Sequence, residues 1–394
     1  MNALAKITDF ADVYAGGGAP QNADDFSENG IPFLRAGSLP KLLNGAKESD
    51  LEKITNEVAK KHKLQLHKKG SVVFAKSGMS ATKGHIYRLK DDCYVVNHLA
   101  VIKPNANCDS NYLEHALKKY SPTTLILDAA YPSIRLSDIS DFKIPLPPIA
   151  QQQRIAAILD KAAEIKAKRE QAISKLHELA QSTFVEMFGD FEQAINYTVK
   201  PLSQLIQDTR LGLVRGATEL DEQKKYAYMR MNAITKSGDL QLEKMFRADA
   251  TDAEVEQYKL RMGDFLFNTR NSRELVGKTA IFDLDGLYLF NNNIMRIRFN
   301  ELVNSVYVAA SFQTKYVQRK LEQIKSGTTN VFAIYYKDLE KIEIPIPSIT
   351  EQNLFAKKMD FIKKSRNLLL NALDIDGELI NSLQHQAFTT GFNA

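Results

Sequence analysis

The chain has 394 residues, of which 44% are hydrophobic and 25% are charged, with a formal net charge of +5 at pH 7. This length predicts two or more domains, and the composition excludes a disordered tail. The mild basic excess is compatible with a nucleic-acid partner without establishing one. Two cysteines, Cys93 and Cys108, do not indicate a disulfide framework or a four-ligand zinc site. No signal-peptide region or apolar run of ~18 residues stands out, so we expect a cytoplasmic protein.

The first part of the chain predicts a mixed domain of short strands and few helices. Runs of β-branched and aromatic residues at 72–75 and 94–96 are bounded by Gly, Asn and Asp, which is typical of strands. A helix is predicted at 112–120, with Asp109 or Ser110 as its N-cap. We therefore expect a mixed α/β or β-rich globular domain.

A long amphipathic helix is predicted next. Residues 151–188 contain no proline or glycine, and apolar residues recur mainly every three or four positions. Roughly 40 residues would span about 60 Å at 1.5 Å per residue. So long an apolar stripe needs a partner, and its predicted packing residues are Ile155, Leu159, Ile173, Leu176 and Phe184.

The second part of the chain predicts the same succession. Strands are expected at 279–283 and 295–299, followed by one helix from Asn304 or Ser305 to Lys325, stopped by Gly327. A second long helix follows 348, and Gly377 within it predicts a kink or a loosened turn. The second helix's predicted packing residues are Ile362, Leu369, Leu373 and Leu383.

The sequence repeats itself with a period of roughly 200 residues. Ile-Pro-Leu-Pro-Pro-Ile at 144–149 recurs as Ile-Pro-Ile-Pro-Ser-Ile at 344–349, and each copy is followed by a glutamine, Gln152 or Gln352. Other matches follow in the same order, so chance does not explain them. These pairs are 31–35 with 226–230, 69–74 with 262–267, 97–102 with 292–297, and the phenylalanines 184/188 with 388/392.

The repeat defines the expected domain organisation. We assign a first globular domain to 1–148, a first long helix to 149–190, a second domain to 197–347 and a second long helix to 348–394. The first helix leads away from domain one and the second leads back, so they are expected to pair antiparallel. Two similar domains related by a pseudo-two-fold axis would match the symmetry of duplex DNA. Because the domains differ in sequence, they would read different half-sites, separated by a gap that the helices set.

The repeat, the segment Ile-Pro-Leu-Pro-Pro-Ile-Ala-Gln-Gln-Gln-Arg-Ile at 144–155 and the helix after it resemble the specificity subunits of Type I restriction-modification enzymes. The resemblance covers essentially the whole chain. It implies two target-recognition domains, each reading one DNA half-site, and an antiparallel two-helix coiled coil as spacer. It also implies docking of two methyltransferase subunits, with restriction subunits outside them. Catalysis would belong to those partners, which would use S-adenosylmethionine, and ATP with Mg²⁺ for restriction. Ser348 replaces the Pro148 of the first copy, so the second motif is degenerate.

The chain lacks the motifs that an independent enzyme would carry. The Asn/Asp-Pro-Pro-aromatic tetrapeptide of an adenine methyltransferase is absent, and Gly16-Gly17-Gly18 fails the cofactor pattern G-x-G-x-x-G. We interpret those glycines as a flexible turn. Gly277-Lys278-Thr279 resembles the end of a phosphate loop, but Ser272 occupies the position that requires the first glycine. We therefore expect a non-catalytic protein that holds no cofactor itself.

Polar loops are the predicted DNA contacts, since base and phosphate contacts use Arg, Lys, Asn, Ser and Thr. Segments 76–85 and 268–278 follow matched Gly-x-x-x-Phe strands, and 325–330 is a third polar loop. A solvated turn is the plainer interpretation of each loop, and the matched arginines could instead bind carboxylates. A basic cluster of five lysines at 60–69 could face phosphates or solvent. The candidate contacts are Arg35, Lys76, Ser77, Lys83, Arg230, Arg270, Asn271, Arg273, Lys278, Lys325, Thr328 and Thr329.

Two other functions remain open from sequence. One is a self-contained DNA methyltransferase or nuclease with fused recognition domains, against which the missing motifs count. The other is a structural scaffold whose long helices bind proteins, against which the two divergent globular domains count.

Overall fold

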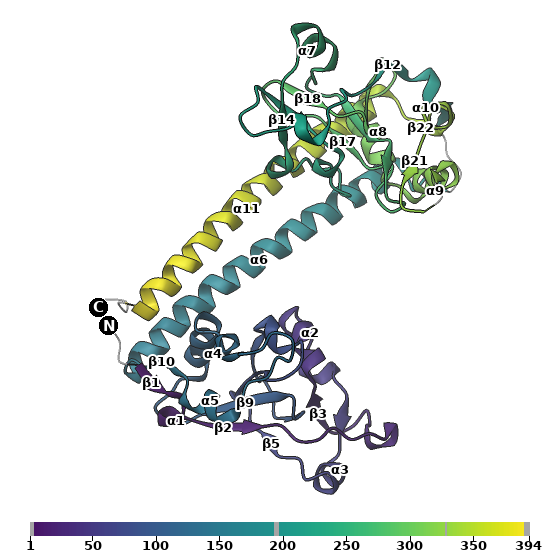
Figure 1. Cartoon of the computed structure of the whole chain (residues 1–394). Helices are drawn as coiled ribbons and strands as arrows, with labels where there is room; N and C mark the ends of the chain where they lie inside the picture. Colours follow the sequence, from purple (N-terminus) through teal and green to yellow (C-terminus); the bar gives the residue numbers. More distant parts are fainter. Residues whose placement is uncertain (1–3, 193–196, 328, 390–394) are drawn as a thin grey trace. The chain divides into compact units, whose positions relative to one another are not determined.

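The computed structural model describes residues 4–192, 197–327 and 329–389, and the chain divides into two compact units. Unit 1 contains residues 1–170 and 371–394, and unit 2 contains residues 171–370. Two long helices, α6 (Ile149–Phe188) and α11 (Ile349–Thr389), each contribute a segment to both units. Figure 1 shows both helices together with the strands and short helices that surround their ends.

The domain of unit 1 is built on two four-stranded sheets with the orders β2-β9-β6-β7 and β4-β3-β8-β5. Strands β3 and β8 run parallel, and the other pairings are antiparallel. A separate two-stranded sheet pairs β1 with β10 and so joins the start of the domain to its end. The elements are β1 (Leu4–Lys6), α1 (Ile7–Phe10), β2 (Ala11–Ala15), β3 (Ile31–Leu34), α2 (Leu39–Leu43), β4 (Lys53–Ile54), α3 (Asn56–Lys61), β5 (Leu66–His67), β6 (Val72–Ala75), β7 (Ile86–Arg88), β8 (Cys93–Val95), β9 (Leu99–Pro104), α4 (Ser110–Lys119), α5 (Leu136–Asp141) and β10 (Lys143–Pro145).

The domain of unit 2 repeats this topology. The order β12-β19-β15-β17 corresponds to β2-β9-β6-β7, β13 runs parallel to β18 as β3 does to β8, and β11 pairs with β22 as β1 does with β10. A small sheet, β16-β21-β20, is added. The elements are β11 (Thr198–Pro201), β12 (Ile206–Leu211), β13 (Tyr226–Met229), β14 (Phe246–Ala248), α7 (Asp252–Tyr258), β15 (Phe265–Asn268), β16 (Arg270–Asn271), β17 (Thr279–Ile281), β18 (Tyr288–Phe290), β19 (Ile294–Phe299), α8 (Ser305–Ser311), α9 (Lys315–Ile324), β20 (Ser326–Gly327), β21 (Phe332–Ala333), α10 (Tyr336–Leu339) and β22 (Glu343–Ile346).

The central strand of each domain separates two hydrophobic cores. Val72 and Phe74 of β6 belong to one core, whereas Val73 and Ala75 belong to the other. Successive side chains of a strand point to opposite faces, so a sheet covered on both faces needs an uninterrupted apolar run. Strand β15 does the same, with Phe265 and Phe267 in one core and Leu266 in another. The matched runs therefore allow the sheet that contains β6, and the sheet that contains β15, to pack against a hydrophobic core on each face.

Most predicted elements are confirmed, and one is corrected. The predicted strands correspond to β6, β8, β17 and β19, and Asp109 caps α4 by accepting the backbone N–H groups of Asn111 and Tyr112. The single helix predicted from Asn304 to Lys325 is wrong, because the structure has two helices, α8 and α9. Thr314 starts α9 by accepting the backbone N–H of Val317, so this second N-cap divides the segment. Helix α11 runs through Gly377 without a break.

A buried glutamine joins each domain to its long helix. The Gln152 amide donates to the carbonyl oxygens of Asn107 and Pro147, at 2.9 and 2.8 Å, and its Oε1 accepts the backbone N–H of Asp109 at 2.8 Å. Gln352 repeats this arrangement with Leu302, Pro347 and Asn304. Both glutamines are fully buried. The repeated Gln therefore satisfies backbone groups that the helix entry would otherwise leave unpaired.

A buried tyrosine completes each junction. Tyr112 of α4 donates its hydroxyl hydrogen bond to the carbonyl of Pro145, and Tyr307 of α8 donates to the carbonyl of Pro345, both at 2.7 Å. These prolines belong to the duplicated motif, so the motif marks the point where the helix leaves its domain. Proline suits this position because it needs no partner for a backbone N–H.

The predicted packing residues of the long helices differ in burial. Ile155, Leu159, Phe184 and Ile362 are buried. In unit 1, Ile155 and Leu159 belong to the domain core, against which Leu383 also packs. In unit 2, the rings of Phe184 and Phe355 lie 5.5 Å apart. The other predicted packing residues are half-buried: Ile173, Leu176, Leu369 and Leu373.

The two helix segments within each unit run antiparallel. In unit 1, the Arg169 guanidinium donates to the carbonyl of Ala372 at 2.9 Å and lies 2.5 Å from the Asp376 carboxylate, whereas the earlier Ile155 shares a core with the later Ala387. This agrees with the predicted antiparallel pair and confirms the predicted fold class of mixed domains with long paired helices. Among the described residues, no helix combines the length and hydropathy required to cross a membrane.

Candidate nucleic-acid interface

In unit 1, the predicted loop at 76–85 is hydrogen-bonded to a second segment, residues 126–135. The N–H of Ile134 donates to the carbonyl of Lys76 at 2.8 Å, the N–H of Gly78 donates to Pro132 at 2.9 Å, and Ser77 and Ser133 form an antiparallel bridge. We call these two segments together the first tip. The sequence predicted only the segment 76–85, because the hydrogen-bonded residues of the two segments are more than 50 positions apart and no local sequence pattern indicates such pairing.

The first tip carries cations without acidic partners. Lys76 is half-buried, Lys83 is exposed, and among the residues described here neither has an ion pair. Ser77 Oγ and His98 Nδ1 are hydrogen-bonded at 2.8 Å, so this serine is partly engaged within the protein. The two lysines are therefore available to phosphate groups, as a phosphate contact requires.

Unit 2 contains an equivalent second tip, formed by residues 268–278 and by residues 325–327 and 329–334. The N–H of Ile334 donates to the carbonyl of Thr269, which matches the bond of Ile134 with Lys76. Here the segments are regular enough to form strands, with Arg270 paired to Ala333 and Asn271 to Phe332. Arg270 is exposed. Both domains therefore display the same pair of segments, with different side chains.

Other candidates in the second tip are engaged inside the protein. The Asn271 amide donates to Asn268 Oδ1, and its Oδ1 accepts the N–H of Ser272, both at 2.9 Å. The Lys278 ammonium donates to the carbonyls of Met231 and Ile234, and its burial lowers its pKa. These bonds favour a structural role for both side chains, although their contact with DNA stays a prediction.

A carboxylate links two further cations of the second tip. Arg273 donates to Glu322 Oε1 through Nε and Nη2, at 2.8 and 2.6 Å, and Lys325 Nζ lies 2.7 Å from Glu322 Oε2. Lys325 and Arg273 both lower the pKa of Glu322, Lys325 the more strongly. Thr329 is exposed beside these residues in sequence, and Thr328 lies outside the described residues, as does Phe392. Glu322 would compete with phosphate for both cations.

The matched arginines lie over aromatic rings. The Arg35 guanidinium is 5.1 Å from the ring centre of Phe26, and its Nε donates to Glu52 at 2.8 Å. The Arg230 guanidinium is 5.0 Å from the ring centre of Phe246. Each arginine caps a short 3₁₀ helix with nearly identical backbone angles. Local stabilisation therefore accounts for these matched positions without DNA, and DNA contact by either stays a prediction.

The basic cluster at 60–69 is also partly engaged. Lys61 and His62 both bind the Asp25 carboxylate at 3.0 Å, and Lys68 lies 2.7 Å from Asp92. His67 is buried. The cluster therefore presents fewer available cations than its sequence indicates.

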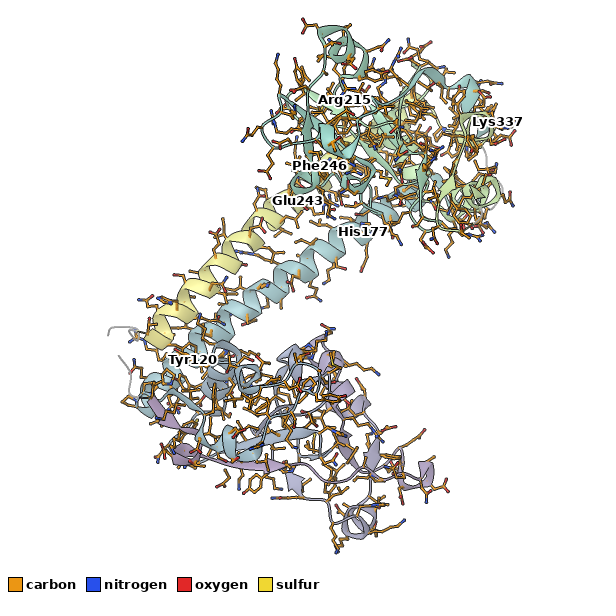
Figure 2. The ribbon with its side chains drawn as sticks, viewed as in Figure 1. Tyr120, His177, Arg215, Glu243, Phe246 and Lys337 are labelled. Carbon is orange, nitrogen blue, oxygen red and sulfur yellow. The ribbon has the colours of Figure 1, made fainter. Side chains whose placement is uncertain are left out.

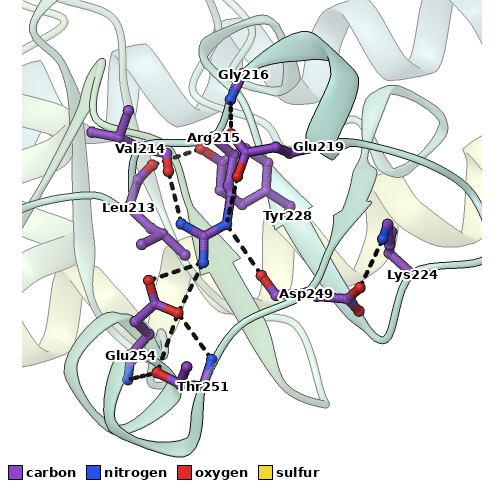
Figure 3. A network of polar contacts seen from close by, with 10 residues as sticks. All are labelled: Leu213, Val214, Arg215, Gly216, Glu219, Lys224, Tyr228, Asp249, Thr251 and Glu254. Carbon is purple, nitrogen blue, oxygen red and sulfur yellow. Dashed lines mark hydrogen bonds and ion pairs between the residues drawn. The ribbon is translucent and has the colours of Figure 1, made fainter.

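A network around Arg215 fixes the loop after β12 in unit 2 (Figures 2 and 3). Arg215 Nη2 donates to both Glu254 oxygens, at 2.9 and 2.8 Å, and its Nε donates to the carbonyl of Asp249. Glu254 also accepts the backbone N–H of Thr251, and this bond together with Arg215 lowers the pKa of Glu254. The Tyr228 hydroxyl donates to the carbonyl of Leu213 at 2.6 Å. Arg215 therefore links the loop after β12 to Asp249 and Glu254, which indicates a structural role.

Gly16 of the segment 16–18 does not lie in a flexible turn, which corrects the interpretation from sequence for this glycine, whereas a Cβ on Gly18 would meet no atom within 4 Å. A Cβ on Gly16 would lie 2.2 Å from the carbonyl oxygens of Val95 and Val96, and a Cβ on Gly212 would lie 2.2 Å from that of Phe290. Gly17 then forms a parallel bridge with Val96. Glycine is required here because two backbones approach closely.

A profile of the Type I restriction modification DNA specificity domain matches residues 3–175 and, a second time, residues 199–374. The chain belongs to this family. The two matched ranges coincide with the two copies of the repeat, and the predicted resemblance is confirmed. The matching relatives are named specificity subunits, which agrees with the predicted role as a DNA-recognition subunit.

Named relatives of this specificity-domain family are distant in sequence. The Type I restriction enzyme EcoKI specificity subunit of Escherichia coli (strain K12) is 21% identical over 388 residues, covering 91% of this chain and 82% of that protein. The MjaIX specificity subunit of Methanocaldococcus jannaschii is 24% identical over 191 residues, covering 48% of this chain. The chain spans less than half the length of the two M. jannaschii subunits that it matches.

Solved structures share the fold of this family member. A Type-I restriction-modification system S subunit from M. genitalium has a TM-score of 0.62 at 12% identity, covering 98% of this chain and 96% of that chain. A second structure, described as showing complex assembly and conformational transition of the type I R-M system, has a TM-score of 0.55 at 16% identity and covers 98% of this chain and 97% of that chain. These likenesses support the fold of two domains with long helices.

Proposed function

We propose that this protein recognises a bipartite, asymmetric sequence in double-stranded DNA, with one half-site read by each domain. The observation that carries this proposal is the duplicated reading surface: the first and second tips are held by equivalent hydrogen bonds but carry different side chains. A repeated scaffold with divergent contact loops is what two different half-sites require, because base contacts specify sequence and phosphate contacts position the protein.

The long helices would set the unread gap between the half-sites. Helix α6 has 40 residues and α11 has 41, so each has a length of about 60 Å at 1.5 Å per residue. The buried Gln152 and Gln352 each bind backbone groups of the domain from the first turn of the long helix. A hydrogen-bonded junction at each domain supports a spacer of defined length rather than a flexible tether.

The exposed face of α11 in unit 2 supports docking of a helical protein partner. Leu354, Phe361 and Leu368 follow one another at seven-residue intervals and are 52%, 72% and 72% exposed. A heptad row of exposed apolar side chains is typical of a helix face that packs on another helix. We propose that two methyltransferase subunits dock on the long helices and that restriction subunits join through them. S-adenosylmethionine, and ATP with Mg²⁺, would be bound by those partners.

Selection from a random-sequence duplex pool tests the DNA proposal. The chain assembled with its methyltransferase subunits should enrich two specified blocks separated by a constant gap. Exchanging the second domain for that of another family member should change one block and leave the other unchanged. A single continuous motif, or equal retention of all duplexes, would contradict the proposal, and the second outcome would favour the scaffold alternative.

A further inference from the structure

The first tip exposes large apolar side chains on a backbone that is held in place. Leu127 is 95% exposed and Tyr131 is 83% exposed, while Met79 on the partner segment is 64% exposed. Isolated exposed apolar residues are common on protein surfaces. These three are not isolated, since they belong to two segments that hydrogen bonds join directly. They gain almost nothing from burial in this chain, so the fold gives no reason for their presence.

The backbone beneath them is well anchored. The carbonyl of Pro132 accepts the N–H of Gly78, and the N–H of Ile134 donates to the carbonyl of Lys76. Pro132 and Ile134 are buried, and the N–H of Ala130 donates to the Asp128 carboxylate. The Tyr131 ring is therefore presented to solvent from a fixed backbone, which lowers the entropy lost when a ligand covers it.

The two segments that carry this apolar group also carry cations. Lys76 and Lys83 lie on the partner segment, and Arg135 follows the exposed residues and is itself exposed. Within the described part of the chain, none of these three cations has an ion pair. The acidic side chain on the segment is Asp128, which accepts a backbone bond of its own turn. Cations beside an exposed aromatic ring suit a polyanion whose bases present flat apolar faces.

The second tip has a related but weaker feature. At the position 200 residues after Tyr131, Val331 is 58% exposed on the segment that precedes β21. The equivalent of the bond between Ile134 and Lys76 is present there, between Ile334 and Thr269. An exposed apolar residue at this place is therefore a property of both domains, whereas the aromatic ring is specific to unit 1.

We propose that Tyr131, with Leu127 and Met79, is an apolar wedge that contacts base faces within the first half-site, while Lys76 and Lys83 bind the flanking phosphates. Apolar and aromatic side chains are used in this way at kinked base steps of duplex DNA. The inference rests on the proposed function, since it assigns residues to a half-site. It predicts that unit 1 distorts its half-site at the base step beside Tyr131.

Replacement of Tyr131 tests the wedge in the complex with methyltransferase subunits. Tyr131→Ala should weaken binding to the duplex that the wild-type complex selects by about ten-fold, since one base stacked on an aromatic ring contributes on that scale. Selection with this variant should lose preference at adjacent positions of the first half-site and keep the second. Tyr131→Phe should bind as the wild type does, because the ring and not the hydroxyl makes the contact.

Leu127→Ala should weaken binding in the same direction, and Leu43→Ala is its matched control. Leu43 is an exposed leucine of α2, outside both segments of the first tip. Unchanged target affinity and unchanged selection for Tyr131→Ala would overturn the proposal. So would loss of methyltransferase assembly by this variant with DNA binding retained, because the patch would then be a protein-docking surface.

A measurement on the wild-type complex keeps the test independent of variant folding. Substituting 2-aminopurine for adenine at successive positions of the first half-site should give a fluorescence rise at one step, since insertion of the ring unstacks it. Equal fluorescence at all positions would overturn the wedge. If the wild-type complex selects no two-part target, the proposed function itself fails. If the wild-type complex selects a two-part target and Tyr131→Ala does not change it, only the wedge fails.

Discussion

Gln152 is predicted to be among the most sensitive residues of unit 1. Gln152→Met keeps the side-chain length and removes three hydrogen bonds, to Asn107, Pro147 and the backbone N–H of Asp109. At about 1 kcal/mol of net stability per bond, the loss is about 3 kcal/mol. A buried backbone group left without a partner costs ~1–3 kcal/mol, so the loss can exceed that value where water cannot enter. This is a large part of the ~5–15 kcal/mol that stabilises a domain.

Hydrogen exchange measured by mass spectrometry reports this change locally. The amide of Asp109 and the start of α4 should lose protection in Gln152→Met, because Gln152 holds the backbone of the residue that caps α4. The α8 region of unit 2 should keep its protection, since Gln352 still holds it. Gln153→Met is the matched control, because Gln153 is exposed on the next position of the same helix. A decrease of less than about 1 kcal/mol in the free energy of unfolding for Gln152→Met would refute the reasoning. An equal decrease for Gln152→Met and Gln153→Met would also refute it.

The remaining predictions concern the spacer, the second tip and the helix face. Inserting four residues after Glu170 and four after Leu370 lengthens each helix by about one turn, roughly 6 Å at 1.5 Å per residue, and the unread gap should lengthen by about one or two base pairs with both half-sites retained. Target selection would show a changed half-site if the spacer idea were wrong. Glu322→Gln should free its two cations for phosphate and steepen the salt dependence of DNA binding, and a flatter dependence would argue against it. The folded state lowers the pKa of Glu322, so its ion pairs stabilise the fold above the ordinary glutamate pKa, and this contribution is lost as pH falls through the lowered pKa. The free energy of unfolding should therefore fall more on acidification in the wild type than in Glu322→Gln. Replacing the exposed Leu354, Phe361 and Leu368 of α11 by serine should prevent co-purification of methyltransferase subunits. The circular dichroism spectrum should stay unchanged, and complexes that remain intact would exclude this face as the docking surface.

The sequence predicts the repeat well because the repeated residues have strict physical roles. The duplicated proline motif marks the helix exit, and the glutamine after it binds three backbone groups in each copy. Uninterrupted apolar runs such as that of β6 predict strands buried on both faces, as the structure shows. Asp109 was identifiable as an N-cap because its bonds are local.

Nonlocal features escape sequence reasoning. The two segments of each tip are far apart in the chain, so the exposed Tyr131 could not be placed beside the loop at Lys76. The glycine at position 16 resembled a flexible turn because the backbone that excludes a Cβ there comes from residues 95–96. Lys278 resembled a free cation because the carbonyls that bind it precede it by more than 40 residues. In each case a distant backbone group decides the role of the side chain.

The most direct test of a two-part reader is the methylation pattern left on DNA. Genomic DNA from cells that express this protein with its methyltransferase subunits can be sequenced by a method that detects methylated bases on single molecules. The account predicts methylation within one asymmetric motif of two specified blocks separated by a fixed gap, and its absence when this chain is omitted. Methylation at a continuous motif, or an unchanged pattern without this chain, would contradict it.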